Sequence, residues 1–109
     1  MSRYQVVLTK SAGRDIEAAY AWWSDHRSKS QADTWYRRIH AAIQTLAERA
    51  DGCAKSPESD LLPTGLWQLN FGVRSRPTHR IVFTIDAGRV VVLRVRHVAQ
   101  RDLTIVDLS

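Results

Sequence analysis

The sequence has little cysteine and no long apolar run, which excludes several classes of protein. Cys53 is the single cysteine among 109 residues, so neither an intrachain disulfide nor a cysteine-rich zinc site can form. The longest aliphatic run, Val90–Leu93, is far too short to span a bilayer. No apolar segment of a secretory signal follows Arg3. These absences predict a cytosolic protein in a reducing compartment, without a membrane partner.

Motifs of the common enzyme classes are also missing. The histidines, His26, His40, His79 and His97, are scattered, and no pair has the helical spacing of zinc ligands. The sequence contains no glycine-rich phosphate loop and no serine nucleophile with a recognisable local signature. We therefore expect no metal, no cofactor and no small-molecule substrate.

Acidic residues are scarce in the C-terminal third of the chain. Residues 71–109 contain seven arginines and three aspartates, a net charge of +4, whereas residues 1–70 contain nine basic and eight acidic side chains. This surplus predicts an acidic partner for the C-terminal third, which can be nucleic acid, an acidic protein or a phosphorylated target. The alternative is a basic face that meets only solvent.

Hydrophobic periodicity predicts one α+β domain over residues 1–109. Period-two alternation indicates strands, and apolar stripes at helical spacing indicate helices capped at Ser11 and Ser30. The expected strands are residues 3–9, 66–71, 79–86 and 89–97, and the expected helices are about 11–25 and 31–49. Residues 51–65 are expected to form a loop, and the tail after His97 has no strong pattern. The order β-α-α-β-β-β predicts an antiparallel-rich twisted sheet with an α-helical hairpin packed on one face.

The hairpin "HRIVFTIDAGRVVVLRVRH", residues 79–97, raises the question of where its arginines point. A two-residue turn would place Arg94 and Arg96 on the core face beside Ile81, which is costly. A three-residue loop that ends in a left-handed Gly88 shifts the pairing of the two strands by one residue. Arg94 and Arg96 then point to the opposite face, and the core face carries no charge. We therefore expect the three-residue loop, with Arg80 directly opposite Arg94.

The second face of this hairpin is then both cationic and apolar. It combines Arg80, Arg94 and Arg96 with the exposed valines Val82 and Val92. Such a face suits an anionic partner that also buries valine. In the alternative interpretation, carboxylates of this chain, such as Asp102 or Asp107, fold back and neutralise the arginines.

Four segments together resemble the RelE/ParE toxins of bacterial type II toxin–antitoxin modules. They are "DIEAAYAWW", "QADTWYRRIHAAIQTLA", "LWQLNFG" and the hairpin above, and the resemblance covers nearly the whole chain. In this family, RelE-like members cut mRNA on the ribosome, whereas ParE-like members poison DNA gyrase. Both are neutralised by an antitoxin. The segments "AAYAWW" and "RVRHVAQ" look more like the ParE branch, often labelled plasmid stabilisation protein.

The resemblance to RelE-like nucleases also implies candidate catalytic positions. Arg80 matches their arginine on the penultimate strand, Arg101 matches the arginine after the last strand, and Arg74 and Arg76 lie near an upstream basic pair. No tyrosine follows Arg101, where such a nuclease would carry one. His97 is the candidate general acid or base, although parity places it with the core face.

The sequence thus predicts a gyrase-directed toxin rather than an enzyme, with a ribosome-dependent mRNA endonuclease as the alternative and an inactive family member as a third possibility. We expect an acidic antitoxin segment, disordered alone, to fold over Arg80, Arg94 and Arg96 and over the helical hairpin. Trp22 lies off the main apolar stripe of the first helix, so it is a further candidate partner contact.

Overall fold

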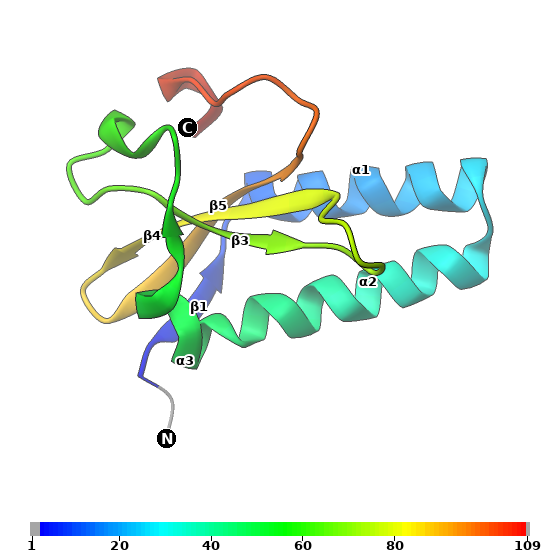
Figure 1. The fold of residues 1–109 in the computed structure, drawn as a ribbon, viewed down its shortest axis with the longest axis horizontal. Coiled ribbons are helices and arrows are strands. Elements are labelled where there is room, and N and C mark those ends of the chain that lie inside the picture. The colour runs from blue at the N-terminus through cyan, green and yellow to red at the C-terminus, as the bar shows by residue number, and fades with distance from the viewer. Residues whose placement is uncertain (1–2, 109) are drawn as a thin grey trace.

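Two helices pack on one face of a mixed sheet, as the sequence predicts. The computed structural model describes residues 3–108. Its elements are β1 (Gln5–Leu8), α1 (Lys10–His26), α2 (Lys29–Gln44), α3 (Leu46–Arg49), β2 (Ala54–Lys55), β3 (Trp67–Phe71), β4 (His79–Asp86), β5 (Arg89–His97) and the 3₁₀ helices Ala50–Gly52, Ser59–Leu61 and Ile105–Leu108. Within these residues, five strands form a sheet in the order β1-β5-β4-β3-β2, in which β1 is parallel to β5 (Figure 1). The short strand β2 is an addition to the predicted order.

Both long helices are capped two residues earlier than expected. The Thr9 hydroxyl, not Ser11, accepts the Ala12 N–H and caps α1, and Ser28 caps α2 in the same way. The predicted caps at Ser11 and Ser30 are therefore wrong. The two helices form an antiparallel hairpin whose turn lies beyond the end of the sheet (Figure 1). None of the helices in residues 3–108 is long and apolar enough to cross a membrane.

The sheet is covered on both faces. The helices cover one face, where the main core forms from apolar side chains: Ala12, Ile16, Trp35, Ile39, Ile43, Leu46, Ala50, Phe71, Ile81, Phe83, Val90, Val92 and Val95. On the other face, Leu66, Val82 and Leu103 form a second buried cluster. Leu103 belongs to the C-terminal tail, so the tail folds back over the sheet. Residues 51–65, expected to be a loop, contain the end of one 3₁₀ helix (Ala50–Gly52), β2 and a second 3₁₀ helix (Ser59–Leu61).

The expected three-residue hairpin loop is wrong. Asp86 pairs with Arg89, and the turn consists of Ala87 and Gly88, whose φ angles of 52° and 77° are both positive, as a type I′ turn requires. The structure avoids buried arginines in the helix-side core by a β-bulge instead. Leu93 is an extra, unpaired residue on β5. Beyond it, each side chain of β5 points to the face opposite to the one that regular alternation would give.

The bulge also changes the expected cross-strand partners. Arg80 lies opposite Arg96, and Arg94 lies opposite Val82, so the predicted Arg80–Arg94 pair is wrong. The expectation that Val82 and Val92 are exposed is also wrong, because each is 0% exposed. The two-residue turn places them on opposite faces, because Val92 pairs with Phe83 and not with Val82: Val82 packs against Leu103, and Val92 belongs to the main core.

Candidate functional site

The predicted site residues separate into two regions of the molecule. We call one the arginine network, formed by arginines and carboxylates on the sheet face away from the helices and at its edge: Asp15, Glu58, Arg80, Arg94, Arg96, Arg101 and Asp107. We call the other the aromatic groove, which lies between α1, the start of α2, the loop 72–78 and the ends of β4 and β5. Trp22, Arg74, Arg76 and His97 line it.

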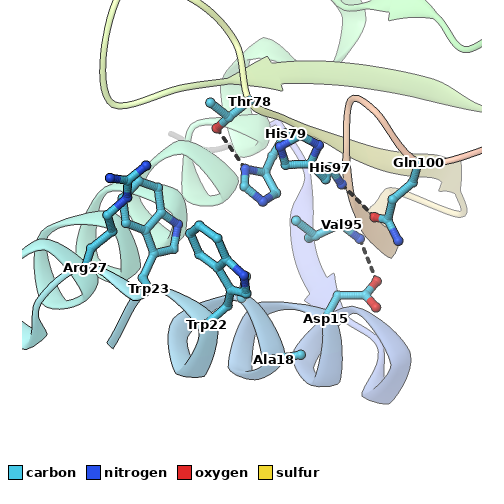
Figure 2. Close-up of a pocket in the computed structure, with 11 residues that line it drawn as sticks. Asp15, Ala18, Trp22, Trp23, Arg27, Thr78, His79, Val95, His97 and Gln100 are labelled. Carbon is cyan, nitrogen blue, oxygen red and sulfur yellow. Dashed lines mark hydrogen bonds between the residues drawn. The ribbon is translucent and has the colours of Figure 1, made fainter. Parts of the chain in front are cut away.

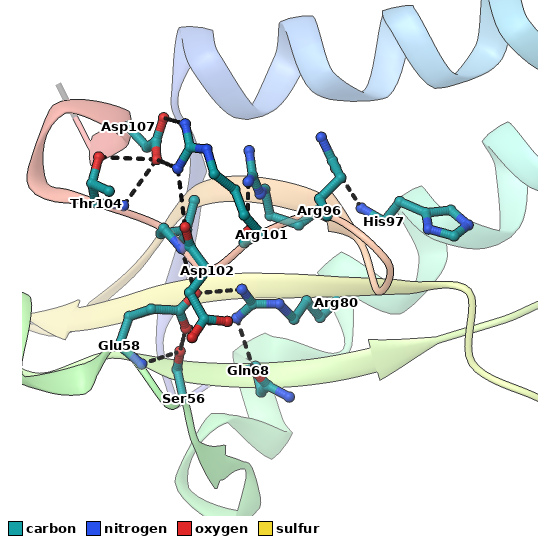
Figure 3. A network of polar contacts seen from close by, with 12 residues as sticks. Ser56, Glu58, Gln68, Arg80, Arg96, His97, Arg101, Asp102, Thr104 and Asp107 are labelled. Carbon is teal, nitrogen blue, oxygen red and sulfur yellow. Dashed lines mark hydrogen bonds and ion pairs between the residues drawn. The ribbon is translucent and has the colours of Figure 1, made fainter.

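Arg80 is held by a carboxylate within the network. Its guanidinium donates two hydrogen bonds to Glu58, one of them from Nη1 to Oε1 at 2.7 Å, and the side chains are 9% and 3% exposed (Figure 3). Glu58 also accepts the Leu103 N–H at 2.8 Å and the Ser56 hydroxyl. Burial alone would raise the Glu58 pKa, but these donors lower it to about 2. Glu58 therefore joins β4, the loop before β3 and the C-terminal tail.

Arg94 and Arg101 also have carboxylate partners within the chain. Arg94 donates from Nε and Nη2 to the two oxygens of Asp15, at 2.7 and 2.9 Å. Asp107 pairs with Arg101 at 2.8 Å and lies 3.9 Å from Arg94. The Arg101 guanidinium and the Thr104 N–H hold the pKa of Asp107 well below its usual range. The expected alternative, in which Asp107 folds back, is confirmed, while Asp102 offers Arg101 its backbone carbonyl.

Arg96 differs from its neighbours because it is buried without a counter-ion. It is 5% exposed and makes no ion pair with any residue in 3–108. Its Nη2 donates to the Arg101 carbonyl at 2.8 Å, and its Nε has no acceptor among those residues. Burial, and then the charge of Arg94, lower the Arg96 pKa. This cation is therefore tolerated without a carboxylate partner.

The candidate nuclease residues do not lie together in the structure. Arg80 and Arg101 belong to the arginine network, whereas His97 lies opposite His79 on the helix side of the sheet. Arg74 and Arg76 lie in the loop between β3 and β4 and line the groove. In the part of the chain that the structure describes, no cluster of three His, Cys, Asp or Glu could hold a metal ion.

The first half of the aromatic groove is a cavity of about 500 Å³ with an apolar floor. Trp22 and Trp23 rise from α1 toward His79 and His97 at the end of the sheet (Figure 2). Ala18, Ala19 and Val95 complete the floor. The volume lies in the ~300–1,000 Å³ range of ordinary binding sites.

Trp22 is a large exposed apolar side chain, as the sequence suggested. It is 47% exposed, stacks on His26 with ring centroids 4.6 Å apart, and meets Trp23 edge to face. The stacking follows from helical geometry, because residues four apart share one face of a helix. One face of the Trp22 indole is therefore covered by the His26 imidazole.

The histidines of the groove are arranged edge to face. The ring centroids of His79 and His97 are 5.3 Å apart, and His79 Nδ1 hydrogen bonds with the Thr78 hydroxyl. Burial, and secondarily the nearby His97, lower the pKa of His79 to about 4. His79 is therefore neutral near pH 7, and it adds to the apolar character of the groove.

The second half of the groove is richer in hydrogen-bond donors. A cavity of about 330 Å³ shares Trp23 and Thr78 with the first and is also lined by Ser30, Gln31, Thr34, Trp35, Val73, Arg74 and Arg76. The loop that carries the two arginines turns tightly after β3. A Cβ at Gly72 would lie 2.3 Å from the Arg76 carbonyl oxygen, so only glycine fits there.

Sequence reasoning missed Glu58 as the partner of Arg80. The two residues are 22 positions apart, and no local pattern in "KSPESDLL" indicates a buried carboxylate. It also missed the groove as a unit, although Trp22, Arg74, Arg76 and His97 were each singled out. The spacing of Trp22 and His26 was the available signal.

Comparisons with known proteins agree with this architecture. The sequence matches the family described as "ParE toxin of type II toxin-antitoxin system, parDE" over residues 6–102. No curated protein sequence gives a significant match. Among solved structures, the chromosomal ParDE toxin–antitoxin system from P. aeruginosa is similar, with a TM-score of 0.71 and 19% identity over 88% of this chain and 97% of that one. The YoeB dimer from Staphylococcus aureus has a TM-score of 0.46 and 14% identity, over 88% and 98% of the chains. Because the family match spans most of the sequence, the chain belongs to the ParE toxin family of type II toxin–antitoxin systems.

Proposed function

We propose that this ParE-family toxin acts in the cytoplasm by binding DNA gyrase, without enzymatic chemistry of its own, and is silenced by a cognate antitoxin. One observation carries the non-enzymatic part: Arg80, the candidate phosphate-binding arginine of β4, and His97, the candidate acid–base residue, lie on opposite faces of the sheet. General acid–base catalysis requires the proton donor or acceptor within hydrogen-bonding reach of the reacting group. The gyrase target follows from the family's ParE branch.

The alternative function is ribosome-dependent cleavage of mRNA. It requires Arg80 and Arg101 to clamp a phosphate, and in this structure Glu58 and Asp107 already occupy both guanidinium groups. A phosphate would have to displace two carboxylates, one of them buried, before it was bound. This requirement makes the alternative the less favourable reading of the same residues.

Two in vitro assays distinguish the candidate functions. The toxin is expected to inhibit supercoiling by gyrase and to trap gyrase-dependent double-strand breaks, and equimolar antitoxin is expected to restore activity. In a translation extract we expect intact mRNA. Cleavage of mRNA on ribosomes that Arg101→Ala abolishes would overturn the proposal in favour of the nuclease. If induced expression without antitoxin leaves growth unchanged, the chain is an inactive member, and the proposal fails.

A further inference from the structure

We propose that the basic end of the aromatic groove binds the phosphate backbone of duplex DNA. We call this surface the arginine rim and define it by four exposed arginines: Arg27, Arg38, Arg74 and Arg76. The inference rests on the proposed action on DNA gyrase, whose substrate is duplex DNA. It adds a second contact to that complex, between the toxin and the DNA that gyrase holds.

The arginine rim is assembled from three segments of the chain. Arg27 follows the end of α1, Arg38 lies on α2, and the other two arginines belong to the loop between β3 and β4. Arg38 donates from Nη1 to the Val73 carbonyl at 3.4 Å, so this loop lies against α2. Arg27 and Arg74 line one cavity of about 340 Å³, and Arg74 and Arg76 line the neighbouring cavity of about 330 Å³. The four arginines therefore belong to one continuous surface.

The positive charge of the rim is not neutralised within the chain. None of its four arginines forms an ion pair with any residue in 3–108. No acidic residue from that range lines the two cavities that the arginines share. The net charge of the whole chain, +5, adds long-range attraction to an anion. A protein that places such side chains on DNA phosphates releases condensed counterions, which is the main source of sequence-independent affinity.

Neutral groups beside the arginines also suit phosphate oxygens. The Ser30 hydroxyl and the Gln31 amide line the cavity of the loop arginines, and both residues are exposed. They lie in the first turn of the 16-residue helix α2, where the helix dipole favours negative charge. Arginine, serine and glutamine side chains and helix N-termini are the groups that contact DNA phosphates in known complexes. The rim combines all of them on one surface.

The aromatic side chains next to the rim favour a duplex over a single strand. Proteins that bind single strands stack successive bases on a series of aromatic rings. Here Trp22 and Trp23 meet edge to face, with an interplanar angle of 89°, and Trp22 is already stacked on His26. Two perpendicular indoles cannot stack on consecutive bases. Phosphate contacts carry no sequence information, so we expect binding that is independent of DNA sequence.

The direct test titrates a fluorescein-labelled DNA duplex of about 20 base pairs with full-length toxin freed from antitoxin, at a series of salt concentrations. We expect the double variant Arg74→Gln and Arg76→Gln to raise Kd by about tenfold or more near 0.1 M salt. The slope of log Kd against log salt concentration should fall by about 2, because each lost phosphate contact removes about 0.9. An unchanged Kd and slope would overturn the inference.

The matched control is the double variant Arg49→Gln and Arg89→Gln. It removes the same charge from two exposed arginines that lie outside the groove and form no ion pair within residues 3–108. We expect its Kd to change by less than about twofold. The charge-preserving variant Arg74→Lys and Arg76→Lys should keep the wild-type slope. Equal losses in the two glutamine variants would show that only net charge matters, which would overturn the inference.

Two competing ligands identify the chemical class of the partner. We expect the DNA duplex to bind more tightly than a polyglutamate peptide of about 20 residues or an RNA duplex of the same sequence. Tighter binding of the peptide, lost in the Arg74→Gln and Arg76→Gln variant, would assign the rim to an acidic protein. Tighter binding of the RNA with the same dependence would assign it to RNA. Either result would overturn the inference.

Failure of this inference is distinguishable from failure of the proposed function. In a gyrase cleavage assay, we expect the Arg74→Gln and Arg76→Gln toxin to need about tenfold more protein than the matched control to trap double-strand breaks. If this variant is as potent as wild type and binds DNA as tightly, the DNA surface is wrong and the function stands. If the rim binds duplex DNA but wild-type toxin leaves gyrase unaffected, the target is wrong and the DNA surface stands.

Discussion

The arginine network and the aromatic groove are both rich in arginine, yet the two regions use it differently. In the network, Arg80, Arg94 and Arg101 each bind a carboxylate of the same chain. In the groove, Arg27, Arg74 and Arg76 bind none among residues 3–108. The comparison teaches that a surplus of positive charge in the sequence does not locate a binding surface. The groove arginines keep their positive charge without a counter-ion among the described residues.

The difference follows from what covers each region. The loop after β2 and the C-terminal tail fold over the network and bring Glu58 and Asp107 to its arginines (Figure 3). The groove lies between α1, the start of α2 and the end of the sheet, and neither the loop after β2 nor the tail over residues 101–108 lines it. This division predicts different responses of the two regions to substitution and to pH.

The largest effect is expected from breaking the buried ion pair of the network. Arg80→Met leaves the Glu58 carboxylate buried without its partner, and the free energy of unfolding should fall by about 3–5 kcal/mol. Urea denaturation of purified protein measures it. The double variant Glu58→Leu with Arg80→Met should recover most of the loss. If Arg80→Met loses less than about 1 kcal/mol, the pair does not hold the network together.

The free energy of unfolding should fall over two separate pH ranges as the pH is lowered, one range for each region. We call these ranges the upper and the lower window. Glu58, with a pKa lowered to about 2 from 4.5, stabilises the fold above pH 4.5, and this contribution is lost as pH falls toward 2. His79, with a pKa lowered to about 4 from 6.5, must stay neutral, so stability falls as pH drops from 6.5 toward 4. Each window should span roughly 3 kcal/mol.

Single variants assign each window to its region. In urea titrations at a series of pH values, His79→Gln should remove the upper window and keep the lower one, while Glu58→Gln should do the reverse. An upper window that persists in His79→Gln would show that the groove histidine is not its source.

Arg96 should respond in the opposite direction to its cross-strand neighbour Arg80. Because Arg96 is buried without a counter-ion, Arg96→Met removes a charge that burial disfavours. We expect the free energy of unfolding to stay equal or rise by about 1–2 kcal/mol. Thermal and urea denaturation measure it beside Arg80→Met. Destabilisation as large as that of Arg80→Met would mean that Arg96 also has a strong internal partner.

The smallest effect on stability is expected in the groove. Arg74→Gln and Arg76→Gln remove exposed cations without ion pairs, so the free energy of unfolding should change by less than about 0.5 kcal/mol. The same urea measurements check it. A loss above 1 kcal/mol in either variant would show that the groove arginines are structural and would remove the contrast between the regions.

The element order was predictable because it depends on local patterns. Periods of two and 3.6 residues are visible in a single segment, so the helices and the four longer strands were expected where they occur. The helix starts were displaced because Thr9, Ser11, Ser28 and Ser30 are all competent caps two residues apart. Choosing between them depends on packing, which a single segment does not encode.

The hairpin shows how a correct constraint can lead to a wrong solution. The sequence required that Arg94 and Arg96 avoid the helix-side core, and they do. Two devices satisfy that requirement, a longer loop or a bulge, and the sequence around Leu93 does not distinguish them. The partner of Arg80 was beyond prediction for a different reason, since Glu58 comes from a segment without periodicity.

Leu93 is a surplus residue between Val92, which lies opposite Phe83, and Arg94, which lies opposite Val82. Deleting that single surplus position would join Val92 directly to Arg94, keep Arg94 opposite Val82 and Arg96 opposite Arg80, and leave both guanidinium groups on the face away from the helices. A relative with the same two-residue turn and one residue fewer here would therefore keep the same buried positions with a regular strand, and an alignment that places the gap in the turn instead of at Leu93 would superpose buried positions on exposed ones over residues 89–92.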